Sequence, residues 1–228
     1  MIKAVIFDLD DTLYDEIDYC RSGFAAVAEY LAVHVLSQDE QSRIFQTLWS
    51  IFIAGNKKTT FNAALKKLRI EPTHEMISTL IQIYRTHKPD ITLPAESLQL
   101  LGTIKTQYHT GLLTDGFLPA QQYKVQALDI EKFFEHIIYT ESLGRQFWKP
   151  SPKGFQILLD KLNVSPENTV YIADNPEKDF IAPNELNMHS IQIDRQRRIH
   201  APIYAEKNAL PSQSADSIAN IPDMINLL

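Results

Sequence analysis

The sequence predicts an α/β fold in which a three-layer core with a parallel sheet carries an inserted bundle of α-helices as a cap. Two observations predict the core: short apolar runs recur along the chain, and helical patterns lie between the later runs. A third observation predicts the insertion. About a hundred residues without a strand pattern separate the first run from the second, far more than a simple crossover needs.

The apolar runs are typical of buried strands in a Rossmann-like sheet. The first, Ile2–Phe7, ends abruptly in acids. The later strands are expected at Gly111–Leu113, His136–Tyr139, Thr169–Ala173 and Ser190–Ile193. Helical patterns follow Pro94, with Leu98, Leu101 and Ile104, and Ser151-Pro152, with Phe155, Leu158, Leu159 and Leu162. We therefore expect residues 1–13 and 90–228 to form the catalytic core.

Residues 14–89 have helical periodicity throughout. One apolar face contains Ile17, Cys20, Phe24, Val27, Leu31 and Val35. A capping box of Ser37 and Glu40 precedes a second helix, and further helices are expected at 61–68 and 76–87. Helices that covered the sheet would alternate with strands, so we expect a separate helical cap domain.

The composition excludes several classes of protein. The 228 residues are 44% hydrophobic and 22% charged, as in a soluble globular protein. A net charge of -6 argues against a nucleic-acid partner, and no apolar stretch approaches the roughly 20 residues that span a bilayer. The single cysteine, Cys20, excludes an intrachain disulfide. We expect a cytoplasmic protein without a signal peptide; its oligomeric state is open.

Polar residues follow the apolar runs where strands are expected to end. They are Asp8, Asp10, Asp11 and Thr12 after the first run, Thr114, Asp115 and Gly116 after the second, Lys149 past a loop after the third, and Asp174, Asn175 and Asp179 after the fourth. In a doubly wound sheet, ligands bind beyond the carboxyl ends of the strands, so we expect these side chains to meet.

Their chemistry suits a phosphate ester and a metal ion. Asp8 and Asp10 lie on the same side of the strand end, and clustered carboxylates are ligands that select Mg²⁺. Asp174 completes such a ligand set. Lys149 supplies a point charge, while Thr114 and the turn at Gly116 offer hydrogen-bond donors to phosphate oxygens. The sequence predicts a magnesium-dependent site for a small phosphorylated metabolite.

Four motifs in this order resemble those of the haloacid dehalogenase superfamily, and specifically its phosphatases with a helical cap. Asp8-Leu9-Asp10-Asp11-Thr12 is similar to the first motif of that family, and Leu112-Leu113-Thr114 to the second. Lys149-Pro150 resembles the third, and the acids from Asp174 to Asp179 resemble the fourth. The resemblance covers nearly the whole chain.

The resemblance implies a role for each of these residues. Asp8 attacks phosphorus and forms an aspartyl-phosphate, while Asp10 protonates the leaving oxygen and later deprotonates water. Mg²⁺ is held by the Asp8 carboxylate, the Asp10 backbone carbonyl and Asp174, with Asp179 or Asn175 in support. Thr114 and Lys149 orient the phosphoryl group, together with the turn at Asp115 and Gly116.

Asp10 favours phosphate esters over haloacids as substrates. An alcohol leaving group needs a proton and a halide does not, so a dehalogenase has no need of an acid at this position. The alternatives are another enzyme of the same scaffold, a haloacid dehalogenase or phosphosugar mutase, or a non-catalytic binding or regulatory scaffold. The identity of the substrate is open.

Two polar segments remain to be placed. Asn56, Lys57 and Lys58 lie in the loop 55–60 of the expected cap, where they either contact the non-phosphate part of the substrate or form a solvated turn. The arginines of 195–198 are expected in a solvated loop.

Overall fold

A computed structural model describes residues 1–199 and 207–228. The chain divides into two compact units. The first contains Met1–Ile17 and Thr92–Leu228, and the second contains Asp18–Ile91. That the second unit is a domain that caps the first remains a prediction.

The first unit is built on a six-stranded sheet in which all paired strands are parallel. Its strands are β1 (Ala4–Phe7), β2 (His109–Thr114), β3 (His136–Tyr139), β4 (Thr169–Ala173), β5 (His189–Ile193) and β6 (Gln213–Ala215), in the order β3-β2-β1-β4-β5-β6. The five expected strands are confirmed, whereas β6 was not expected. β1 lies between β2 and β4, so the first motif follows a central strand.

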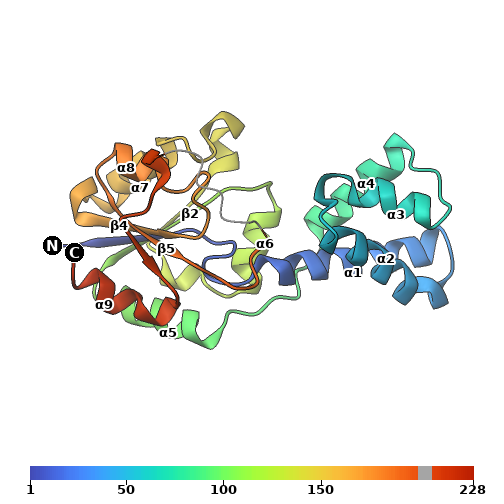
Figure 1. Cartoon of the computed structure of the whole chain (residues 1–228), viewed down its shortest axis with the longest axis horizontal. Coiled ribbons are helices and arrows are strands. Elements are labelled where there is room, and N and C mark those ends of the chain that lie inside the picture. The colour runs from blue at the N-terminus through green and yellow to red at the C-terminus, as the bar shows by residue number, and fades with distance from the viewer. Residues whose placement is uncertain (200–206) are drawn as a thin grey trace. The chain divides into compact units, whose positions relative to one another are not determined.

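Helices cover both faces of this sheet and make the three layers that the sequence predicts (Figure 1). On one face, α7 (Lys153–Leu162) and α8 (Ile181–Glu185) pack on the sheet. Their contact forms one apolar cluster that includes Ile6, Leu113, Tyr171, Phe155 and Leu158. This cluster holds together β1, β2 and β4, the strands that are followed by the polar residues of the motifs.

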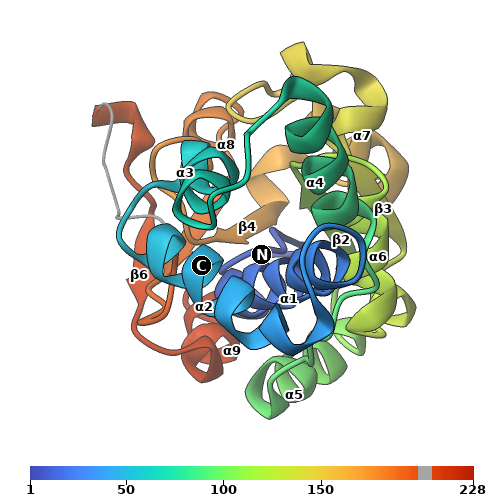
Figure 2. The same cartoon turned by 90° about the vertical axis from the view of Figure 1, so that its right-hand side faces the viewer.

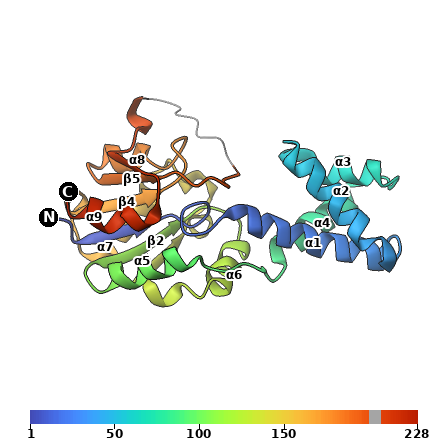
Figure 3. The same cartoon turned by 60° about the horizontal axis from the view of Figure 1, so that its bottom comes forward.

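On the other face, α5 (Ala95–Lys105) and α9 (Ile221–Ile225) lie side by side (Figure 3). Leu101 and Ile104 of α5 are buried, as expected, but Leu98 is 49% exposed. The helix expected after Pro94 is confirmed, and its buried face also contains Ser97 and Leu100. Between β2 and β3 the chain forms the short helix α6 (Ala120–Ala127).

The second unit is helical (Figure 2). Its helices are α1 (Glu16–His34), which begins in the first unit, α2 (Gln41–Ile53), α3 (Thr60–Lys67) and α4 (His74–Thr86). Phe24 lies at the centre of its apolar core, with ring contacts to Trp49, Phe52, Phe61 and Tyr84. These aromatic contacts join the helices of the unit.

The expected capping box at Ser37 and Glu40 is wrong. The Ser37 hydroxyl bonds the Asp39 side chain and caps no backbone N–H, because a 3₁₀ turn at Gln38–Glu40 precedes α2. Within residues 1–199 and 207–228, no helix has the length and apolar character of a membrane span.

Candidate active site

The sheet topology brings the polar residues to one edge. Phe7 pairs with Leu112 of β2 and Ile172 of β4, so the residues that follow these three strands are neighbours. The Asp8 N–H donates to the Ile172 carbonyl at 2.9 Å and continues the ladder by one residue. Asp8 therefore lies where the carboxyl ends of the central strands meet.

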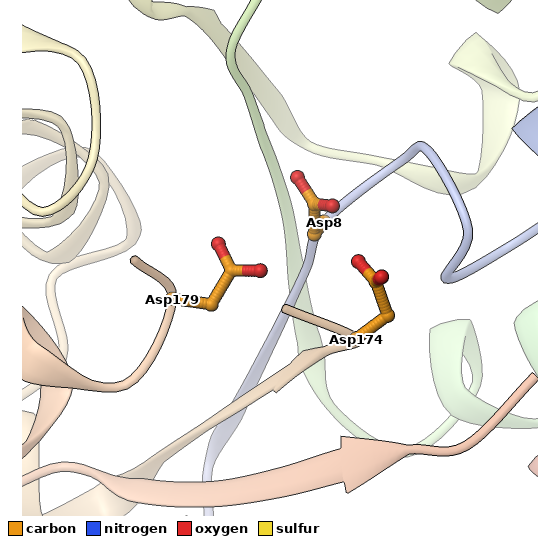
Figure 4. Close-up of side chains that lie close together, drawn as sticks. All are labelled: Asp8, Asp174 and Asp179. Carbon is orange, nitrogen blue, oxygen red and sulfur yellow. The ribbon is translucent and has the colours of Figure 1, made fainter. Parts of the chain in front are cut away.

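Three buried carboxylates gather at this position. Figure 4 shows Asp8, Asp174 and Asp179 directed toward one another, Asp8 after β1 and Asp174 after β4. One oxygen of each lies within 4.8 Å of the others. Burial, opposed by Lys149 and reinforced by Asp179, raises the pKa of Asp8 to about 6. Burial and the charges of Asp179 and Asp8 raise the pKa of Asp174 well above its usual range.

Lys149 is a buried cation beside this cluster. Its Nζ lies 2.6 Å from Asp8 Oδ1 and 2.7 Å from Asp179 Oδ1. It also donates to the Tyr171 hydroxyl at 3.0 Å. The charges of Asp179 and Asp8 outweigh the effect of burial and hold the pKa of Lys149 well above its usual value. Lys149 thus remains an ammonium group that contacts two of the three carboxylates.

The donor set fits a magnesium ion. Lys149 contacts two of the three carboxylates, and the oxygens of the cluster are the hard ligands that Mg²⁺ prefers. The Asp179 carboxylate belongs to this cluster. The Asn175 Oδ1 instead accepts from the Glu177 N–H at 3.0 Å, and the Asn175 N–H donates to Asp179 at 3.1 Å.

The Asp10 carboxylate is not one of the three in the cluster and has its own set of donors. Lys124 Nζ lies 2.8 Å from both of its oxygens, Gln121 Nε2 donates to Oδ2 at 2.8 Å and the Tyr14 hydroxyl donates to Oδ1 at 2.5 Å. Burial acts to raise the pKa of Asp10, but Lys124 and these hydrogen bonds lower it. Asp10 rests as a carboxylate held by three donors.

The expected phosphate-binding turn follows β2. Thr114 is buried, and the Asp115 carboxylate accepts from the Thr140 hydroxyl at 2.7 Å and from the Lys149 backbone N–H at 3.2 Å. The Asp115 side chain therefore anchors the loop that carries Lys149. Gly116 has φ +139°, a conformation that favours glycine.

Sequence reasoning missed Gln121, Lys124 and Tyr171. Tyr171 is buried within β4, where its hydroxyl donates to Asp179 at 3.4 Å. Because side chains alternate between the two faces of a strand, the position of Tyr171 in β4 could have indicated that it faces the site. Gln121 and Lys124 lie on a short helix that no apolar pattern marks, and the sequence carried no signal for their contact with Asp10.

The expectation that Arg195 lies in a solvated loop is wrong. Its side chain is 10% exposed and donates to the Thr12 carbonyl at 3.0 Å, to Asp15 at 3.2 Å and to the Ser97 hydroxyl at 3.2 Å. Arg195 therefore fastens the segment after the first motif to α5. Arg197, also bonded to Asp15, is 56% exposed.

Asn56, Lys57 and Lys58 belong to the second unit. All three are exposed, and Lys57 begins a 3₁₀ turn at Lys57–Thr59. The Asn56 carbonyl accepts from the Thr60 hydroxyl at 2.7 Å. A contact of these residues with substrate remains a prediction.

The chain is similar to known proteins. The family model described as haloacid dehalogenase-like hydrolase matches residues 5–193. A glyceraldehyde 3-phosphate phosphatase of Methanopyrus kandleri is 29% identical over 86% of this chain and 85% of its own length. The protein of the same name from Methanothermobacter thermautotrophicus is 26% identical over 99% of this chain and 100% of its own.

Solved structures share the fold. The putative HAD-hydrolase YfnB of Bacillus subtilis, solved bound to magnesium, superposes with a TM-score of 0.70 at 19% identity and covers 99% of both chains. A 2-haloacid dehalogenase of Pseudomonas syringae has a TM-score of 0.66 at 21% identity, covering 100% of this chain and 99% of its own. At these identities the similarity establishes the fold alone.

Proposed function

The chain belongs to the haloacid dehalogenase-like hydrolase family, and we propose that it is a magnesium-dependent phosphatase of small phosphorylated metabolites. The observation that carries this proposal is the buried group of Asp8, Lys149, Asp174 and Asp179 at one sheet edge. The named phosphatase activity of the similar archaeal proteins supports the same reaction class.

Asp8 is the nucleophile of this proposal. Its carboxylate oxygen attacks phosphorus, the ester P–O bond breaks, and an aspartyl-phosphate forms. Lys149, 2.6 Å from Asp8 Oδ1, lowers the cost of bringing a phosphate dianion to a buried carboxylate. The Thr12 hydroxyl, 3.5 Å from Asp8 Oδ2, and the buried Thr114 are placed to orient the reacting groups.

Asp10 moves the proton in both steps. After taking up a proton from solvent, it gives this proton to the leaving alkoxide oxygen in the first step, and in the second step it takes one from the water that attacks the aspartyl-phosphate. The products are the alcohol and inorganic phosphate. Asp8 returns to its starting form, and Asp10 becomes a carboxylate again when it releases its proton to solvent. The resting carboxylate beside Lys124 is the form that the water step requires.

The carboxylates of Asp8, Asp174 and Asp179, with the Asp10 backbone carbonyl, would hold Mg²⁺. When bound there, the ion offsets the negative charge that phosphate and carboxylates bring together. Thr114, the turn at Asp115 and Gly116, and Lys149 would bind the phosphoryl oxygens.

The helical unit is proposed to act as a cap that selects the substrate. Within it, Asn56, Lys57 and Lys58 are the candidates for contact with the non-phosphate part, because they are exposed and polar. Glyceraldehyde 3-phosphate, named for the similar archaeal enzymes, is the first ester to try. Replacement of Lys57 and Lys58 by alanine should change KM for the best ester more than replacement of the exposed Lys66 and Lys67.

Phosphate release from a panel of phosphate monoesters tests the function. We expect turnover with Mg²⁺ and none after chelation. Dehalogenation of a 2-haloacid without phosphatase activity would refute the proposal, as would turnover of a sugar phosphate only with a bisphosphate activator. Asp10 favours the phosphatase, since only an alkoxide leaving group needs its proton.

A further inference from the structure

The helix α6 carries two buried polar side chains that contact Asp10. We propose that Gln121 and Lys124 are positioning residues, which hold the Asp10 carboxylate in the orientation from which it serves the leaving group. This inference rests on the proposed phosphatase function. It assigns a role in the reaction to two residues outside the four motifs.

The contacts leave Asp10 little freedom. Lys124 Nζ bridges its two oxygens at 2.8 Å each, and Gln121 Nε2 is 2.8 Å from Oδ2. Tyr14, two residues after the first motif, donates its hydroxyl to Oδ1 at 2.5 Å. Gln121 and Lys124 are each only 3% exposed. Fixing an acid/base group in one rotamer spares the entropy of orienting it at each turnover.

The spacing on α6 makes these contacts simultaneous. Residues three apart on a helix share a face, so Gln121 and Lys124 reach the same carboxylate. Gln121 Nε2 also donates to the Asp115 carbonyl at 2.6 Å. The same amide group therefore joins Asp10 to the turn proposed to bind phosphate, and it fixes the acid/base relative to the phosphoryl group.

Gly116 supplies the space that this arrangement needs. A Cβ at this position would lie 2.2 Å from Gln121 Nε2 and 2.9 Å from its Cδ. Such a contact is shorter than side-chain atoms tolerate, so any other residue would displace Gln121 from Asp10. Gly116 thus has a role besides the expected phosphate contact: it admits the Gln121 amide beside the first motif.

The apolar packing of α6 does not require these polar side chains. The packing of α6 on the core is supplied by Ala120 and Val125, both buried and apolar. A buried lysine is costly to desolvate and persists where a partner charge offsets the cost. Lys124 finds such partners in Asp10 and, at 3.5 Å, in Glu16.

The dependence of the rate on the leaving group separates positioning from folding. Lys124→Met and Gln121→Leu are assayed with an alkyl phosphate, whose leaving group needs a proton, and with 4-nitrophenyl phosphate, whose leaving group needs almost none. Gln122→Leu, at an exposed position of the same helix, is the matched control. Thermal unfolding of each variant reports whether it is folded.

We expect kcat for the alkyl ester to fall about 10²-fold in Lys124→Met, within the range that general acid–base catalysis contributes, with a smaller change in KM. The fall for the aryl ester should be at least about tenfold smaller. Gln121→Leu keeps the charge of Lys124 and should also lose more activity on the alkyl ester than on the aryl ester. This variant tests the inference on its own if Lys124→Met does not fold. Equal losses on both esters, or no loss, would overturn the inference while leaving the phosphatase function intact. A wild-type enzyme inactive on both esters would overturn the proposed function and this inference with it.

Discussion

The Nζ of Lys149 lies 2.6 Å from Oδ1 of Asp8, and both side chains are buried. The same ammonium group lies 2.7 Å from Asp179. One cation therefore contacts both the proposed nucleophile and a proposed metal ligand. The charge balance of the site gives the predictions that follow.

Lys149→Met should lower kcat about 10²–10³-fold, as the loss of one preorganised electrostatic contact does in other enzymes. The phosphate dianion would then approach Asp8 without its nearest cation. Kinetics on the best ester measure the effect, with Lys153→Met as the control because Lys153 is exposed in the same segment. Unchanged kcat in folded Lys149→Met would contradict the role given to Lys149.

Magnesium should stabilise the folded protein through the carboxylate cluster. At a concentration about 100 times the dissociation constant, binding to the folded state alone contributes about 2.7 kcal/mol. Thermal unfolding of the wild type with and without Mg²⁺ should show a rise in Tm, and Asp174→Asn should lose most of it. Asp160→Asn, at an exposed position of α7, should keep the rise. An equal rise in Asp174→Asn would remove Asp174 from the proposed metal site.

Asp8 should make the metal-free protein less stable as the pH rises. Burial raises the pKa of Asp8 in the folded state to about 6, above its value in the unfolded chain, so folding favours the neutral acid. The stability that this provides is present below about pH 4 and is lost as the pH rises through about 6.

Urea unfolding without metal ions measures this effect by comparing the wild type with Asp8→Asn, whose side chain is neutral at every pH. At pH 7.5 the variant should be more stable by up to about 3 kcal/mol, and the difference should close near pH 4. A difference that stays constant over this range would contradict the raised pKa.

Arg195→Ala should destabilise the fold by about 1–3 kcal/mol, because three acceptors near the first motif lose a largely buried charged donor. Arg197→Ala removes an ion pair that is 56% exposed on the arginine side and should cost less than about 1 kcal/mol. Urea unfolding of the two variants compares them. Equal costs would show that Arg195 does not fasten this segment.

The sequence predicted the strands where their residues are apolar throughout. The bounds of β3 and β4 agree with the expected His136–Tyr139 and Thr169–Ala173. β6 was missed because Gln213–Ala215 is short, largely polar and at the edge of the sheet, where one side needs no apolar cover.

The sequence also predicted that polar residues after the strands meet at one edge of the sheet. The structure shows Asp8, Lys149, Asp174 and Asp179 close together there. The surroundings of Asp10 could not be read in the same way. Lys124 is 114 residues from Asp10 in sequence, and no spacing pattern in its helix indicates a contact with the first motif. Arg195 was misjudged because arginines close together in sequence usually remain solvated, whereas Asp15 supplies a partly buried partner.

The central claim, that Asp8 carries the phosphoryl group, is tested by trapping it. The enzyme is mixed with Mg²⁺ and an aryl phosphate, quenched in acid within a turnover, digested and analysed by mass spectrometry. We predict one phosphoryl group on Asp8 in the wild type, and neither adduct nor turnover in Asp8→Asn. Full activity in Asp8→Asn, or a phosphoryl group on another residue, would contradict the claim.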